Sequence, residues 1–270
     1  MHFRFLAAPA AALVIIVCGV ALYSDGSTEL AAQAKPSAIP RTADGKPNLQ
    51  GIWQVRNRAA YGLEDHAARH GILAGRSVVE GGTIPYQDWA LKKRDENFLN
   101  REKLDPLNQC FLPGVPRIMY MELPFQIFQT PTHIGMTFEW SQVFRLIYTN
   151  GSKHVQDITF WMGDSRGRWE GDTLVVELTN FNGMTWFDMS GNFHSDALRL
   201  EERYTMTDPD TIRYEVTVTD PKVFTRPWKL SMPLYRHKDM TRLLEYQCQA
   251  EAEEARGDFP REPRTWYPKP

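Results

Sequence analysis

The feature that most constrains the fold is a succession of short segments in which apolar and polar residues alternate. In residues 172–181, DTLVVELTNF, the side chains of Leu174, Val176 and Leu178 fall on one face, and the opposite face is mostly polar. The segment 211–220, TIRYEVTVTD, shows the same alternation. A period of two residues predicts strands with one buried face and one solvated face, which is typical of antiparallel sheets.

About nine such segments follow one another at roughly regular spacing, and turn residues separate them. Residues 170–172, Glu-Gly-Asp, predict a tight hairpin. Further hairpins are predicted over residues 197–220 and 228–249. This spacing indicates a mainly β fold, an antiparallel β-barrel or sandwich, rather than βαβ units. Gly51-Ile52-Trp53 matches the Gly-x-Trp signal that opens lipocalin-like barrels, in which the Trp plugs one end.

One N-terminal helix is predicted over residues 87–103. Pro85 lies near its start, Pro106 ends it, and Trp89 and Leu91 supply an apolar side. We expect residues 48–250 to form a single barrel domain that includes this helix. The acidic and then Pro-rich segment 251–270 is predicted to be a surface tail.

The first residues are typical of a secretory leader. An apolar run over residues 5–22 is followed by a polar stretch and by Ala-Gln-Ala at residues 32–34. This pattern predicts a signal peptide over residues 1–34 and a Pro-rich linker over residues 35–47. An uncleaved membrane anchor and lipidation at Cys18 remain alternatives. Cleavage would make the protein exported, either periplasmic or secreted, with no membrane span left in the mature chain.

Loss of the leader would leave Cys110 and Cys248 as an even pair in an oxidising compartment. A disulfide between them is predicted on that ground. The alternative is two buried free thiols.

The charge balance bears on the partners that the chain can have. The formal net charge is −2, so no broad basic field is available for nucleic acid or for an anionic membrane surface. Aromatic residues make up 12% of the chain, and they pack cores or line concave ligand sites. No metal-ligand spacing or phosphate loop is present, so neither a metal nor a cofactor is predicted.

The segment MTWFDMSGNFHSDALRLEERY, residues 184–204, holds the candidate catalytic residues. Asp188 and His194 could form an acid/base pair, because a neighbouring carboxylate raises the basicity of a histidine and orients its ring. Ser195 follows His194 directly and would point away from it on a strand, so a Ser-His-Asp triad is rejected. The alternative is a hairpin decorated with polar side chains, with Trp186 as an aromatic wall.

Arg145 stands between Val143 and Ile147 on one face of a predicted strand. If that face is interior, the guanidinium needs an acid partner or an anionic ligand. A structural pair with Glu139 on the preceding strand and a clamp for a carboxylate or an oxyanion are the two interpretations. In the second, Tyr148 would help to hold the ligand oxygen.

The connection that begins after Tyr148 contains further ligand-binding candidates. His154 and Trp161 lie in a turn-rich stretch, KHVQDITFWMGDSRGRW, and loops often carry binding groups. Trp161 and Trp186 are predicted to line a pocket. An ordinary turn, in which side chains cap their own backbone, is the alternative.

Residues 80–248 resemble a family of exported bacterial proteins of unassigned function. The motifs RGRWEGDTLVV, NFHSDAL and DPKVFTRPW carry this resemblance. The resemblance implies that the protein is exported and folds as one unit. It implies no particular reaction, substrate or catalytic residue.

These patterns together predict an exported β-barrel with a cavity for a small, partly apolar molecule. In the first hypothesis the barrel is a cofactor-free acid/base enzyme, such as a lyase, hydratase or isomerase, in which His194 moves a proton and Asp188 orients it. The alternative is a non-catalytic periplasmic binding or carrier protein.

Overall fold

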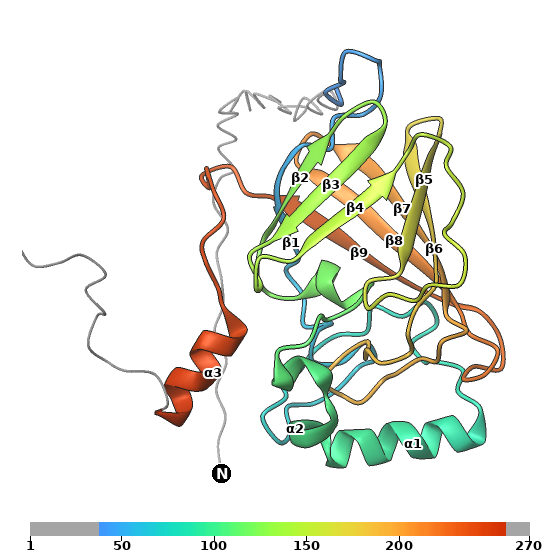
Figure 1. Cartoon of the computed structure of the whole chain (residues 1–270), viewed down its shortest axis with the longest axis vertical. Coiled ribbons are helices and arrows are strands. Elements are labelled where there is room, and N and C mark those ends of the chain that lie inside the picture. The colour runs from blue at the N-terminus through green and yellow to red at the C-terminus, as the bar shows by residue number, and fades with distance from the viewer. Residues whose placement is uncertain (1–37, 258–270) are drawn as a thin grey trace, which may run out of the picture. The chain divides into compact units, whose positions relative to one another are not determined.

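The computed structural model describes residues 38–257, and its architecture is a closed barrel of nine strands (Figure 1). The predicted mainly β barrel is thereby confirmed. The predicted leader and residues 258–270 of the predicted tail lie outside the described residues. The strands are β1 (Gly51–Gln54), β2 (Phe125–Gln129), β3 (His133–Phe138), β4 (Phe144–Tyr148), β5 (Asp164–Glu170), β6 (Thr173–Thr179), β7 (Arg199–Asp208), β8 (Thr211–Thr219) and β9 (Trp228–Arg236).

Each strand pairs with the next one along the chain, and β9 closes the barrel by pairing with β1. All of these pairs are antiparallel except β4 with β5, which are parallel at Ile147↔Ser165 and Tyr148↔Arg166. The sequence predicts an antiparallel sheet throughout. The difference arises because residues 149–163 return the chain to the end of the barrel at which β4 began, so β5 runs in the same direction.

In the alternation that predicts the strands, the apolar residues lie on the inside of the barrel and the polar residues on the outside. In β8 the side chains of Ile212, Tyr214, Val216 and Val218 are buried, and those between them are not. The hairpin of β5 and β6 turns at Gly171, whose φ of +59° is a conformation that glycine adopts without strain. Glu170 pairs with Thr173 across it, as the acid-Gly pattern predicts.

Trp53 of β1 is fully buried and lies where β9 ends. Its indole N–H donates to the carbonyl of Leu49 at 2.9 Å, and the Arg236 guanidinium lies 4.2 Å from the ring centroid. Gly51 makes room for this contact, because a Cβ there would collide with the Arg236 side chain. The Gly-x-Trp signal therefore marks a packed end of the barrel.

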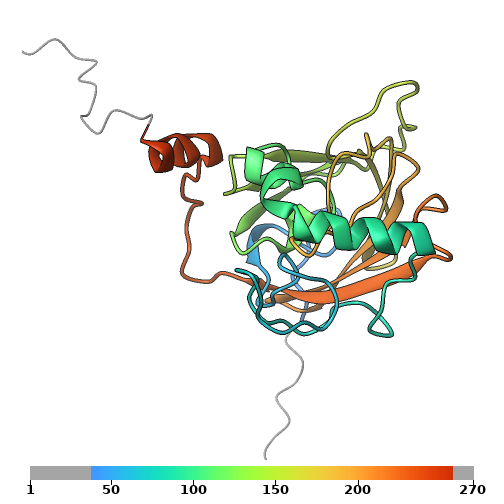
Figure 2. The same ribbon diagram turned by 90° about the horizontal axis from the view of Figure 1, so that it is seen from below.

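The connection between β1 and β2 contains the predicted helix as two pieces, α1 (Asp88–Leu99) and α2 (Arg101–Leu104). The 3₁₀ turns η1 (Pro106–Gln109) and η2 (Arg117–Tyr120) follow. Figures 1 and 2 show α1 lying across one end of the barrel.

The face that α1 buries differs from the predicted one. Ala90, Asn97 and Phe98 are buried, whereas Trp89 and Leu91 are 51% and 41% exposed. The Asn97 side chain donates to the carbonyl of Gly191, so α1 packs on the connection between β6 and β7.

The predicted final strand over residues 240–249 is wrong. The barrel is already closed by β9 and β1, so it leaves no free edge for another strand. The chain instead forms α3 (Cys248–Arg256), which has no buried residue and includes the start of the predicted tail. No helix within residues 38–257 is long and apolar enough to cross a membrane.

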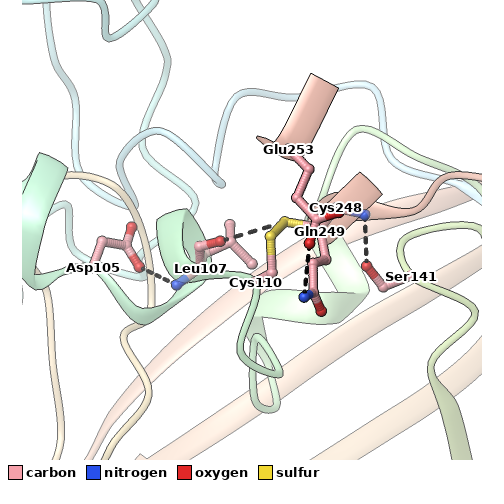
Figure 3. The surroundings of a disulfide bond; sticks show 7 residues. All are labelled: Asp105, Leu107, Cys110, Ser141, Cys248, Gln249 and Glu253. Carbon is pink, nitrogen blue, oxygen red and sulfur yellow. Dashed lines mark hydrogen bonds between the residues drawn. A yellow bond between two sulfur atoms is a disulfide. The ribbon is translucent and has the colours of Figure 1, made fainter. Parts of the chain in front are cut away.

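The predicted disulfide between Cys110 and Cys248 is present, so the alternative of two free thiols is wrong (Figure 3). It joins the residue after η1 to the first residue of α3, across 138 positions of sequence. The backbone N–H of Cys248 also donates to the hydroxyl of Ser141 at 3.3 Å. These contacts hold the segment after β9 to the body of the protein.

We expect the variant Cys110→Ser/Cys248→Ser to be less stable, because its unfolded chain is no longer restricted by a covalent loop. From the loop-closure entropy, the free energy of unfolding should fall by roughly 4–5 kcal/mol. Urea unfolding of the oxidised wild type and the variant measures this. A loss below about 1 kcal/mol, with an intact near-ultraviolet circular dichroism spectrum in both, would contradict the structural role of the disulfide.

Candidate functional site

His194 is buried, with both ring nitrogens hydrogen-bonded to neighbours in the β6–β7 connection. Nδ1 lies 2.8 Å from the carbonyl oxygen of Ser195, and Nε2 lies 2.7 Å from the hydroxyl of Thr185. A carbonyl only accepts, so Nδ1 carries the proton and Nε2 accepts from Thr185. Burial lowers the pKa of His194, so the ring is neutral at physiological pH.

Asp188 is fully buried and accepts hydrogen bonds from four nitrogen donors. These are the backbone N–H groups of Leu63, Ser190 and Asn192, and the side-chain amide of Asn192 at 2.6 Å. Burial raises the pKa of Asp188 to about 6, although these hydrogen bonds oppose the shift. The carboxylate thus joins residues 188–192 to the chain that follows β1.

The predicted acid/base pair of His194 and Asp188 is not formed, because neither side chain bonds to the other. Both groups have partners that fit a structural role in this connection. Trp186 is also buried there and pairs with Phe193 through a single antiparallel bridge. The alternative interpretation, a hairpin decorated with polar side chains, is compatible with the single bridge between Trp186 and Phe193.

Arg145 lies on the interior face of the barrel, together with Val143 and Ile147, and its partner is Glu202 rather than Glu139. Both Arg145 and Glu202 are buried, and they form a two-pronged ion pair whose Nη1–Oε1 distance is 3.1 Å. Glu139 instead accepts from the backbone N–H of Leu244 at 2.9 Å. The partner comes from β7, which is 57 positions further along the chain.

The remaining polar atoms around this ion pair are satisfied inside the barrel. The hydroxyls of Tyr204 and Tyr214 donate to Glu202 at 3.1 and 2.6 Å, and the hydroxyl of Ser165 accepts from the Arg145 guanidinium at 3.2 Å. Burial disfavours the charge of Arg145, but Glu202 outweighs that effect and the pKa of Arg145 is raised. The predicted anion clamp is therefore already filled by a carboxylate of the chain itself.

Asp164 at the start of β5 connects two of the predicted positions, His154 and Tyr148. It accepts from His154 at 2.9 Å and from Arg166, whose guanidinium lies 4.4 Å from the centroid of the Tyr148 ring. His154 also lines a hollow of about 630 Å³ between residues 154–157 and the β6–β7 connection. Trp161 lies elsewhere in the same loop, where it stacks on Phe111 at 5.0 Å. The predicted ligand-binding residues thus do not converge on one site.

A larger hollow, of about 750 Å³, lies beside the chain that leaves β1. Such a volume is within the range of about 300–1,000 Å³ that is typical of small-molecule pockets. Arginines dominate the charge of its lining, and one aspartate opposes them. We call it the arginine hollow, and its lining residues are Arg56, Asn57, Arg58, Asp65, His66, Ala67, Ala74, Gly75 and Arg76.

One wall of the arginine hollow is a short hairpin within residues 65–76. Bridges at His66↔Gly75 and Arg69↔Ile72 hold its two arms together. The turn lies at His70 and Gly71, both of which have positive φ values. Asp65 accepts from the backbone N–H of Ser77 at 2.8 Å and fixes the base of the hairpin.

The arginines of the hollow differ in their partners. Arg58 forms an ion pair with Glu122. Arg56 lies over the ring of Tyr235, 4.6 Å from its centroid. Within residues 38–257, neither Arg56 nor Arg76 has a carboxylate partner, and Arg76 is exposed. Two guanidinium groups are therefore available to a ligand in this hollow.

The sequence does not reveal the arginine hollow, because residues 64–84 have no apolar periodicity that would predict a strand or a helix. The available signal was the Arg-x-Arg pair at residues 56–58, directly after a strand and followed by a Gly- and His-rich segment. That signal alone does not show that the hairpin of residues 65–76 brings Arg76 to the same hollow as Arg56 and Arg58.

A comparison of the chain with models of known protein families and with curated proteins finds no match. In the part of the chain that the structure describes, no group of three or more His, Cys, Asp or Glu side chains is arranged to hold a metal ion.

We predict that Glu202→Gln is strongly destabilising, because it leaves the Arg145 guanidinium buried without a countercharge. Breaking such a pair typically costs about 3–5 kcal/mol, whereas its replacement by apolar or neutral groups costs much less. The double variant Arg145→Met/Glu202→Gln should therefore be more stable than Glu202→Gln. Urea unfolding of the wild type, both single variants and the double variant measures the coupling.

The exposed pair of Arg168 and Glu177 is a matched control, since their side chains are 48% and 53% exposed. Glu177→Gln should have a far smaller effect. Equal losses at the buried and exposed pairs would contradict a structural role for the buried pair.

Proposed function

We propose that the protein is an exported, non-catalytic binding protein whose small-molecule site is the arginine hollow. The observation that carries this proposal is a hollow of about 750 Å³ lined by Arg56 and Arg76, neither of which has a carboxylate partner within the described residues. Exposed ion pairs are common on this protein, so two arginines that share a concave surface and are not paired with its single aspartate, Asp65, are well placed for an external ligand.

The lining also suits a ligand with an apolar part. Ala67 and Ala74 contribute methyl groups along the hairpin, and Asn57 adds an amide that can donate or accept. A small, partly apolar molecule with a polar end is the ligand that this mixture favours.

Export is part of the proposal. The predicted leader and the resemblance to exported bacterial proteins support it, and the disulfide between Cys110 and Cys248 is compatible with an oxidising compartment.

The enzymatic hypothesis has less support. A general base must lie within hydrogen-bond reach of the proton that it takes, and the two nitrogens of His194 are occupied by Thr185 and Ser195. Neither His194 nor Asp188 lines the arginine hollow or the hollow beside His154.

Binding can be located by nuclear magnetic resonance of the ¹⁵N-labelled mature chain titrated with benzoate and, separately, with its neutral analogue benzamide. We expect at least one of these probes to shift amide signals of residues 56–58 and 65–76. Ala74→Trp should abolish those shifts, because the indole fills the hollow.

Leu73→Trp is the matched control, because Leu73 is the adjacent residue and is 43% exposed but does not line the hollow. It should leave the shifts unchanged. If neither probe perturbs residues 56–76, or if Ala74→Trp has no effect, the proposed function is wrong.

A further inference from the structure

His66 in the wall of the arginine hollow faces two hydrogen-bond acceptors. Its Nδ1 lies 2.7 Å from the carbonyl oxygen of Glu64, and its Nε2 lies 2.8 Å from the carbonyl oxygen of Leu73. A neutral imidazole has only one N–H, so it satisfies one of these carbonyls and turns a lone pair toward the other. The doubly protonated ring donates to both. The geometry around His66 therefore fits a cation.

The ring packs against two glycines, since a Cβ on Gly62 or on Gly75 would come within 2.9 Å of it. The slot is part of the fold, because Gly75 and His66 also exchange the backbone hydrogen bonds of the hairpin at 3.0 and 3.1 Å. Nδ1 and Nε2 are thus held in place by the hairpin itself.

The charged groups around His66 favour an anion beside it. Arg56 and Arg58 come from the chain after β1, and Arg76 and Asp65 come from the hairpin. The carboxylate of Glu64, the adjacent acid, is engaged elsewhere, with the backbone N–H of Ile84 and with Arg94. Glu122 is paired with Arg58, and Asp188 is buried behind Leu63, whose backbone N–H donates to it.

We propose that the arginine hollow binds small molecules through a negatively charged group, such as a carboxylate, and that His66 takes up a proton when the anion binds. This inference rests on the proposed function, since it names the ligand class and the regulation of the same site. Arg56 and Arg76 supply the direct contacts, and His66 acts as a positioning residue that stabilises the hairpin and adds positive charge.

The sign of the pH effect follows from linkage. Arg56 and Arg76 carry positive charge that no carboxylate partner within residues 38–257 neutralises, whereas Arg58 is paired with Glu122. An anion bound beside Arg56 and Arg76 offsets this charge and favours the doubly protonated His66 ring. By reciprocity, protonation tightens anion binding, so affinity increases as the pH falls through the range in which histidines titrate.

The experiment measures the dissociation constants of benzoate and benzamide by nuclear magnetic resonance at about pH 8 and about pH 5.5, a range in which histidines titrate and benzoate stays ionised. Benzoate should bind about tenfold more tightly than benzamide. Lowering the pH should tighten benzoate binding at least about fivefold and leave benzamide unchanged.

Matched variants assign the effect to single residues. His66→Gln should remove the pH dependence, whereas His70→Gln, at the tip of the same hairpin, should keep it. Arg76→Gln should weaken benzoate binding and leave benzamide unchanged, whereas Arg69→Gln should change neither. If His66→Gln does not fold, the ring signals of His66 in the wild type decide, since added benzoate should move their titration to higher pH.

The outcomes separate the two levels of the proposal. Equal binding of benzoate and benzamide in the hollow would overturn the anion preference and leave the proposed function intact. Preferred benzoate binding with no pH dependence and no effect on the His66 titration would overturn the role of His66. Absence of binding by both probes would overturn the proposed function itself.

Discussion

The ion pair of Arg145 and Glu202 determines what the inside of this barrel can do. Two buried charges are tolerated only when they are paired and the remaining donors and acceptors are satisfied. Tyr204, Tyr214 and Ser165 complete that network, and apolar side chains from the surrounding strands fill the rest of the interior. An anionic ligand would have to displace Glu202 to reach Arg145. A ligand site is therefore expected outside the barrel, in the connections between its strands.

Two of these connections, β6–β7 and β1–β2, differ in whether the protein itself satisfies their polar side chains. The β6–β7 connection uses Asp188 and His194 as structural groups that hold buried turns together. The β1–β2 connection is long enough to place α1 across one end of the barrel and to form the hairpin of the arginine hollow (Figure 1). Polar groups of the first connection are saturated by the protein, whereas two arginines in the second are not. This contrast is the reason to assign binding to the arginine hollow.

The sequence predicted those parts of the fold that depend on local pattern. Period-two alternation located the strands and grouped Arg145 with Val143 and Ile147 on one face, because successive side chains of a strand point to opposite faces. The structure shows that this face is the interior. It did not identify Glu202 as the partner, since barrel closure brings distant strands together in a register that no local pattern records. The same limit applies to His194, whose spacing from Asp188 suggested a pair that tertiary contacts then separated. The position of Arg76 could not be predicted either, because the hairpin that brings it beside the chain after β1 has no apolar periodicity.

The central claim is that the ligand site lies in the arginine hollow and that the barrel interior is closed to ligands. A crystal structure of the mature protein soaked with 4-bromobenzoate tests this directly, because bromine is located by its anomalous scattering. The account predicts a bromine peak in the hollow, with the carboxylate beside Arg56 and Arg76. A peak inside the barrel, next to Arg145 and Glu202, would contradict it.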